Sequence, residues 1–203
     1  MSKYHKSLIK KIVDVTLSSL CFLITLPLIV FISLASKFTS KGTIFFIQKR
    51  IGKDGKIFKI IKFRTMTPDA EKVKNKFVKL NEADGPVFKI HNDPRFTKFG
   101  KILSRTGLDE LPQFINVLKG EMSMVGPRPL PVNEAKRLTK KQKIRELVKP
   151  GITSSWVIEG SHQMSFKKWM DLDAYYVKNA TFATDIYIIS KTFLMILRSI
   201  LKL

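Results

Sequence analysis

The feature that most constrains this chain is a long apolar run with one proline inside it. Residues Val15–Ser36 carry no charged side chain, and Pro27 lies in the middle of the run. A helix rises about 1.5 Å per residue, so this run would be about 33 Å long, enough to cross a bilayer. Proline has no N–H to donate and its ring presses on the preceding turn, so we expect a bend at Pro27.

Basic residues flank the apolar run on both sides. They are Lys3, Lys6, Lys10 and Lys11 before it, and Lys37, Lys41, Lys49, Arg50 and Lys53 after it. Basic flanks favour the cytoplasmic side of a membrane, and a straight span can place only one flank there. We therefore predict a re-entrant hairpin over residues 1–40, broken at Pro27, and a membrane-associated domain over residues 41–203 on the cytoplasmic face. A simple transmembrane span, a cleaved signal peptide and a buried helix of a soluble protein are the alternatives.

The net charge of the chain is strongly positive, at +21 from 37 basic and 16 acidic residues. Such an excess indicates an anionic partner, which could be nucleic acid, phosphorylated substrates or anionic membrane lipids. Lysines beside an apolar anchor gain about 1 kcal/mol each near anionic lipid, so the membrane is the simplest explanation. The only cysteine, Cys21, excludes an internal disulfide, and the three histidines show no metal-ligand spacing.

The rest of the chain predicts an α+β fold that is mostly helical. Two segments rich in β-branched and aromatic residues, 43–50 and 56–63, flank a Gly-Lys-Asp-Gly turn and indicate a small β-hairpin. Helices are expected over residues 68–80, 97–105, 109–118, 133–148, 165–177 and 184–203. The last has one apolar face, which would suit either an amphipathic helix in the membrane interface or an ordinary core-packing helix.

Two adjacent carboxylates, Asp109 and Glu110, are the strongest candidates for chemistry. They follow Gly107 and precede Pro112, so they fall where a helix would begin. Such residues often serve only as an N-cap and as a complement to the helix dipole. The functional interpretation is that one carboxylate binds a metal ion while the other attacks phosphorus or moves a proton.

Basic residues occur close enough in sequence to serve the same centre. Strand alternation places Lys62 and Arg64 on one face, and Arg105 precedes the acidic pair by one helical turn. Arg128 is fixed between two prolines, and its forked guanidinium suits bidentate binding of phosphate. Taken alone, each of these residues is better explained as a solvated surface charge in a chain this basic.

Seven segments in this order resemble the bacterial sugar transferase family, the small monotopic phosphoglycosyl transferases. Besides the proline-broken membrane helix, they are FKIIKFRTM (58–66), LDELPQ (108–113), NVLKGEMS (116–123), VGPRP (125–129), KPGIT (149–153) and LDAYYV (172–177). The resemblance covers nearly the whole chain.

The resemblance implies transfer of a sugar 1-phosphate from a UDP-sugar to polyprenyl (undecaprenyl) phosphate, with Mg²⁺ as cofactor. Asp109 would be the nucleophile, forming a phosphosugar-aspartyl intermediate with release of UMP, and Glu110 would position the metal or handle a proton. Lys62, Arg64, Arg105, Gln113 and Arg128 would bind the substrates. The product would initiate assembly of a surface glycan or glycoprotein at the cytoplasmic membrane.

The chain departs from the family pattern at three places. Leu26 precedes Pro27 where serine is common, Ser154 replaces a glycine, and Ser161 replaces an arginine near the substrate. These departures leave the sugar, the lipid length and the pathway open, and a homodimer is one option for the oligomeric state. The alternatives are a membrane-tethered basic module that binds nucleic acid and a scaffold without activity, although no nucleic-acid motif is present and we expect no nucleic-acid partner.

Overall fold

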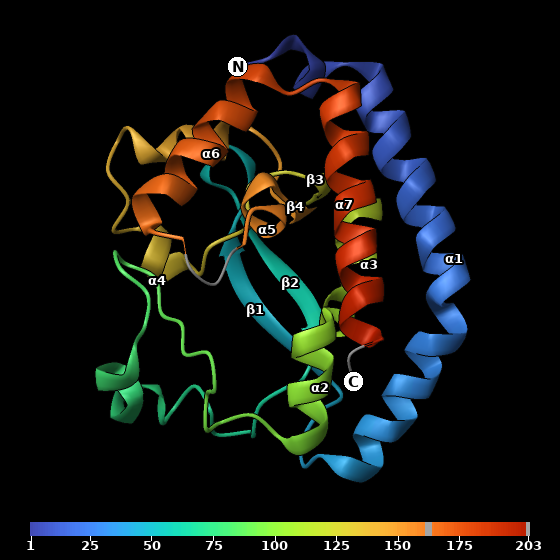
Figure 1. The fold of residues 1–203 in the computed structure, drawn as a ribbon, viewed down its shortest axis with the longest axis vertical. Helices are drawn as coiled ribbons and strands as arrows, with labels where there is room; N and C mark the ends of the chain where they lie inside the picture. The colour runs from blue at the N-terminus through green and yellow to red at the C-terminus, as the bar shows by residue number, and fades with distance from the viewer. Residues whose placement is uncertain (161–163, 202–203) are drawn as a thin grey trace.

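The computed structural model describes residues 1–160 and 164–201. A short 3₁₀ turn, η1 (Lys3–Lys6), leads into α1 (Leu8–Thr39), whose N-cap Ser7 accepts a hydrogen bond from the Lys10 main-chain N. Figure 1 shows α1 running along one edge of the whole molecule. Helix α1 is the one described helix that is long and apolar enough to cross a membrane.

The predicted interruption of α1 at Pro27 is not observed, because the helix continues through this residue. Proline removes a single main-chain hydrogen bond, and the turns on either side keep theirs. Hydroxyls also bond within the helix, with Thr25 donating to the Cys21 carbonyl at 2.7 Å and Ser33 to the Ile29 carbonyl at 2.7 Å. Such hydroxyl bonds to the carbonyl four residues earlier can bend a helix without ending it, and Pro27 lies within one long helix instead of separating two.

Helix α1 packs on the body near both of its ends. Asp14 and Ser18 are buried near its start, and Ile29 and Ile32 are buried farther along, where they join Phe63 and other core residues. The opposite side exposes large apolar side chains, namely Leu8, Ile9, Ile12, Val15, Leu20, Leu23, Ile24, Leu26, Leu28, Val30, Phe31, Leu34 and Phe38. An exposed apolar surface of this size fits a membrane-anchored protein.

The β-hairpin is confirmed. Strand β1 (Phe45–Ile51) pairs antiparallel with β2 (Ile57–Phe63), and the connecting turn contains η2 (Lys53–Gly55), in which Asp54 has a φ of 54°. A second, unpredicted sheet joins β3 (Ser123–Val125) to β4 (Gly151–Thr153) in parallel. These two strands are three residues long, which is too short for a recognisable sequence pattern.

The observed helices agree in part with those predicted from the sequence. Helices α2 (Lys98–Thr106), α6 (Phe166–Asn179) and α7 (Phe182–Ile200) lie where helices were expected, and α5 (Ser155–Ile158) is a single additional turn. The expected helix over 109–118 is divided into η4 (Leu108–Gln113) and α3 (Phe114–Leu118), with Pro112 in the 3₁₀ part. Residues 68–80 form turns and η3 (Lys74–Leu80) instead of an α-helix.

The expected helix over 133–148 is wrong. The chain forms only α4 (Val132–Ala135) and η5 (Gln142–Leu147) there. Thr139 provides the reason, because its main-chain N donates to Gln142 Oε1 at 2.8 Å and its Oγ1 accepts from the Gln142 main-chain N at 3.3 Å. This reciprocal pattern is a capping box, which starts a new helical turn and so ends the previous one.

The mostly helical α+β class is confirmed. Buried residues of β2, α3, β3 and α7 form one core cluster, on which Leu17, Cys21 and Phe22 of α1 pack. A second cluster contains Trp156 and Trp169, whose rings stack with centroids 4.5 Å apart. Helix α7 buries Asp185 and Ile188 and exposes Phe193, Leu194 and Leu197. Its placement in a membrane interface stays a prediction.

Candidate active site

The end of strand β2 and the start of η4 bring two of the predicted residues together. Lys62 Nζ lies 4.0 Å from Asp109 Oδ2, although the two residues are far apart in the chain. Gly107 makes this approach possible, because its φ of 74° ends α2 and turns the chain into η4. This left-handed conformation suits glycine. Asp109 is 6% exposed and therefore largely shielded from water.

Glu110 and Arg128 form the second contact of the site. Arg128 Nη1 donates to Glu110 Oε1 at 2.8 Å. The turn that holds Arg128 approaches another part of the backbone closely, since a Cβ on Gly126 would lie 2.4 Å from the Lys149 carbonyl oxygen. Glycine is therefore required at position 126, and Pro127 and Pro129 restrict the residues that follow.

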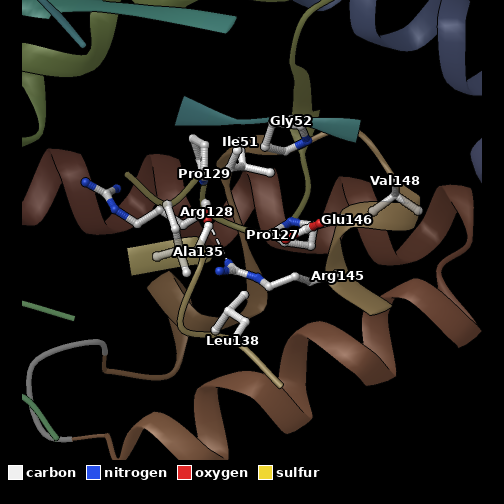
Figure 2. Close-up of a pocket in the computed structure, with 12 residues that line it drawn as sticks. Ile51, Gly52, Pro127, Arg128, Pro129, Ala135, Leu138, Arg145, Glu146 and Val148 are labelled. Atoms are coloured by element: carbon white, nitrogen blue, oxygen red, sulfur yellow. Dashed lines mark hydrogen bonds between the residues drawn. The ribbon is translucent and has the colours of Figure 1, made fainter. Parts of the chain in front are cut away.

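A buried ion pair between Arg145 and Asp173 stabilises the turn that holds Arg128. Arg145 Nη2 donates to the Arg128 carbonyl oxygen at 2.6 Å, as Figure 2 shows, and lies 2.8 Å from Asp173 Oδ2. Burial raises the pKa of Asp173 to about 6, against the lowering effect of Arg145. Arg145 thus fixes the main chain at Arg128 while the Arg128 side chain remains available to Glu110.

The electrostatics of the site follow from burial and from these pairs. Burial raises the pKa of Asp109 to about 6, and the Glu110 charge adds to this effect while Lys62 and Arg128 oppose it. Burial also lowers the pKa of Lys62, although the Asp109 charge opposes that shift. The Glu110 charge raises the pKa of Arg128 above its usual range. The four side chains therefore form one interacting group of charges.

A pocket of about 190 Å³ adjoins Lys62. The basic residues in its lining are Arg50, Lys62, Arg64, Lys74 and Arg95, and the aromatic ones are Phe46 and Phe88. Lys62 Nζ and the Arg64 guanidinium both lie over the Phe46 ring, at 5.4 and 5.8 Å from its centroid, so the predicted common face of these two cations is confirmed. Cations and exposed ring faces in one concave surface suit a phosphorylated ligand with an aromatic base.

Three of the predicted substrate-binding residues have no described contact with the acidic pair. Arg64 donates to the Thr43 carbonyl at 2.8 Å instead. Arg105 is exposed and donates to Asn92 Oδ1 at 3.3 Å. Gln113 is buried in η4 beside Pro112. Ser154 is the N-cap of α5, where its side chain accepts from the Val157 main-chain N. The departure at Ser161 falls outside the described residues.

Three residues of the site were missed by the sequence reasoning. Arg50 donates to the Pro129 carbonyl at 2.9 Å, and burial followed by the Arg128 charge lowers its pKa to about 10. Asn116 is fully buried and binds the open edge of β2, accepting from the Ile61 main-chain N at 3.1 Å and donating to the Lys59 carbonyl at 2.8 Å. Arg145 is the third. Asn116 begins the NVLKGEMS segment, one of those that resemble the family, and this was the only sequence feature that could have identified it.

The acidic pair has a donor set that suits Mg²⁺. Magnesium prefers carboxylate oxygens and is often held by one or two carboxylates together with phosphate oxygens of a substrate. Asp109 and Glu110 supply two such carboxylates next to the basic pocket. No group of three acidic, histidine or cysteine side chains that could hold a metal occurs among the described residues, so the substrate itself would have to complete the coordination.

Lysine and arginine side chains that can bind phosphate oxygens, next to two carboxylates, are compatible with phosphoryl transfer. The comparison with known protein families points to the same class of enzyme. The model of the bacterial sugar transferase family matches residues 5–199, and the chain belongs to that family.

Three relatives illustrate the similarity. The chain is 39% identical over 196 residues to the galactosyl transferase CpsE of Streptococcus agalactiae, covering 96% of this chain and 43% of that protein. It is 36% identical over 187 residues to the exopolysaccharide production protein ExoY of Rhizobium meliloti, covering 90% and 83%. It is 39% identical over 194 residues to the UDP-glucose:undecaprenyl-phosphate glucose-1-phosphate transferase of Escherichia coli, covering 91% and 39%. The chain spans less than half the length of several of the curated relatives it matches.

Proposed function

We propose that this protein transfers a sugar 1-phosphate from a UDP-sugar to undecaprenyl phosphate or another polyprenyl phosphate. The observation that carries the proposal is the buried Asp109 carboxylate 4.0 Å from Lys62, beside the pair that Glu110 forms with Arg128. The names of the relatives support it, because one is an undecaprenyl-phosphate galactose phosphotransferase of Salmonella typhimurium. The product would be a lipid-linked sugar diphosphate that starts a surface glycan.

The proposed first step is attack of Asp109 on the phosphorus that bears the sugar. A bond forms from an Asp109 carboxylate oxygen to this phosphorus, the bond to the bridging oxygen breaks, and UMP leaves with the electron pair. With a pKa of about 6, Asp109 is mostly ionised at neutral pH and can act as the nucleophile. Lys62 and Arg128 would stabilise the negative charge on the phosphate oxygens.

In the second step, a phosphate oxygen of the polyprenyl phosphate attacks the same phosphorus. The acyl-phosphate bond breaks, and Asp109 returns to its free carboxylate. Arg128 holds Glu110 next to this centre, where it can position a metal or take a proton. When bound, Mg²⁺ would neutralise part of the negative charge on the diphosphate of the UDP-sugar. Most of the catalysis would come from placing the reactants and stabilising their charge.

We further propose that α1, although unbroken at Pro27, dips into the membrane and keeps both of its ends at the cytoplasmic face. Two contacts support this topology. Lys10 donates to the Val125 carbonyl near the start of α1, and Ile32 packs with Phe63 near its end, so both parts of the helix stay on one body. A straight crossing would carry one of these contacts to the far side of the membrane. Cysteine labelling of a Ser2→Cys variant in cells should find this residue on the cytoplasmic side, and labelling from outside would contradict the proposed topology.

The decisive experiment is incubation of the purified protein with UDP-glucose or UDP-galactose and Mg²⁺, first without lipid. We expect release of UMP and a hexose-phosphate mass adduct on Asp109, followed by loss of the adduct when undecaprenyl phosphate is added. Asp109→Asn should lower transfer by about 10³-fold or more. Asp54→Asn, a matched change in the exposed hairpin turn, should leave transfer unchanged. Near-normal turnover of Asp109→Asn would show that Asp109 is not the nucleophile.

A further inference from the structure

A second pocket, of about 330 Å³, opens at the start of α1. Its walls come from η1 and the first turns of α1, from Lys53 in the hairpin turn, from β3 and from the segment after η5 that ends at Lys149. None of Lys62, Asp109, Glu110 and Arg128 lines this pocket. The pocket is therefore separate from the candidate active site.

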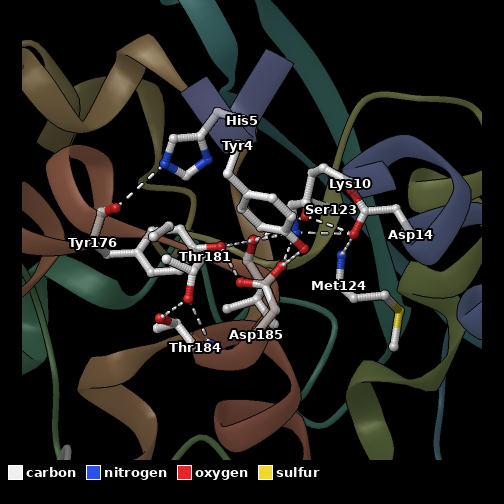
Figure 3. Close-up of polar contacts among 12 residues, drawn as sticks. Tyr4, His5, Lys10, Asp14, Ser123, Met124, Tyr176, Thr181, Thr184 and Asp185 are labelled. Atoms are coloured by element: carbon white, nitrogen blue, oxygen red, sulfur yellow. Dashed lines mark hydrogen bonds and ion pairs between the residues drawn. The ribbon is translucent and has the colours of Figure 1, made fainter. Parts of the chain in front are cut away.

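A buried ion cluster, in which Lys10 pairs with two carboxylates, forms the floor of the pocket. Lys10 Nζ lies 3.1 Å from Asp14 Oδ1 and 2.6 Å from Asp185 Oδ2, as Figure 3 shows. Asp14 Oδ1 also accepts hydrogen bonds from Ser123 Oγ at 2.9 Å and from the Met124 main-chain N at 3.0 Å. This network ties α1 to β3 and α7, and it leaves neither Lys10 nor Asp14 as an open charge for a ligand.

Four other lysines line the pocket with few acidic partners. Within residues 1–160 and 164–201, no carboxylate forms an ion pair with Lys6, Lys11 or Lys149. Lys53 has a single long contact, 4.0 Å from the exposed Asp54. Holding four like charges around one cavity is unfavourable, and an anion inside it would relieve the repulsion. Phosphate oxygens accept several ammonium donors at once, so a phosphate group matches this lining.

The rim of the pocket adds an apolar component. Leu8 lines the pocket and is 70% exposed, and Ile9 and Ile12 continue the exposed apolar surface along α1. A free phosphate would leave these side chains in water, whereas an amphiphile would cover them. We propose that this pocket binds the phosphate of an anionic phospholipid, with its acyl chains against the apolar side of α1. The site would anchor the start of α1 at the membrane surface, whether or not the protein transfers sugar phosphates.

The test uses the full chain in neutral maltoside micelles without a UDP-sugar. Dioctanoyl phosphatidylglycerol is titrated in and the bound lipid is counted by native mass spectrometry. The variant Lys11→Gln/Lys149→Gln removes two pocket charges, and Lys37→Gln/Lys41→Gln removes two charges at the other end of α1. We expect about 30-fold weaker binding for the pocket variant, which corresponds to about 2 kcal/mol for two lysines, and less than threefold weakening for the control. Circular dichroism checks that both variants are folded.

Three results would overturn the proposal. Equal weakening in both variants would mean that only the overall positive charge attracts the lipid. Equal affinity for dioctanoyl phosphatidylcholine would exclude recognition of an anionic head group. Displacement of the lipid by an equal concentration of inorganic phosphate would assign the pocket to a free anion. Since the readout is bound lipid, failure of this proposal is distinguishable from failure of the transfer reaction.

Discussion

Replacing Lys62 by methionine tests whether the Lys62–Asp109 pair controls the chemistry. Methionine fills similar space without the charge, so the change removes the attraction that favours ionised Asp109. Two charges 4.0 Å apart interact by about 4 kcal/mol at an effective dielectric constant of about 20. Lys62 is 24% exposed at its side chain, so we take about half of this value. Because 1.36 kcal/mol corresponds to one pKa unit, the pKa of Asp109 should rise by about 1.5 units in the variant.

The direction of the pH effect follows from the role of the carboxylate. Asp109 attacks only when it is ionised, so the rate should fall about tenfold per pH unit below its pKa. With a pKa of about 6 in the native protein, UMP release should decline as the pH falls through about 6. In Lys62→Met the decline should begin about 1.5 pH units higher, near pH 7.5.

The assay is single-turnover UMP release from a UDP-sugar without lipid acceptor, followed between pH 5 and about 9. Lys59→Met is the matched control, because Lys59 is an exposed lysine of the same strand. It should keep the native profile. The reasoning fails if Lys62→Met and Lys59→Met show the same pH profile, or if the native rate stays constant down to about pH 4.

Three further predictions follow from contacts around the site. Arg145→Met should lower the free energy of unfolding by about 3–5 kcal/mol, because it leaves the buried Asp173 unpaired, whereas Arg145→Met combined with Asp173→Leu should recover most of the loss in urea unfolding. A double variant as unstable as the single one would contradict this. Asn116→Leu should cost about 2–4 kcal/mol by leaving two part-buried main-chain groups of β2 without their partner, measured by thermal unfolding, and a loss under about 1 kcal/mol would contradict this. Arg128→Gln should lower kcat/KM by about 100-fold, because Arg128 contacts Glu110, whereas Arg105→Gln should lower it by less than threefold. Equal losses in the two variants would contradict the placement of Arg128 in the site.

Local sequence predicted the elements whose signals are strong. The hairpin is where two segments rich in β-branched and aromatic residues and a glycine-containing turn placed it, and α2, α6 and α7 begin at the N-caps Thr97, Ser165 and Thr181. The expected helix over 133–148 was wrong because the Thr139–Gln142 capping box starts a new turn, a competing signal that helix periodicity ignores. Pro27 was given too much weight, since one lost hydrogen bond does not end a helix of this length.

The sequence identified the acidic residues of the candidate site better than its basic residues. Asp109 and Glu110 stand out because they follow a turn glycine. Among the basic residues, only the tertiary structure separates Arg128, which contacts Glu110, from Arg105, which lies on the surface. The prolines on either side of Arg128 mark a rigid turn, but the local sequence does not say which arginine meets Glu110, because a charge selects its partner through distance in space.

The sequence by itself determined that the chain carries an apolar helix with basic flanks, a β-hairpin and an adjacent pair of carboxylates. These features depend on neighbouring residues, whose interactions are the same wherever the segment lies. The tertiary structure decided which charges meet. Lys62 with Asp109, Glu110 with Arg128 and Lys10 with Asp185 are contacts between segments distant in the chain. They form only when packing of the core brings those segments within about 4 Å of each other, and charges interact strongly only at such short distances.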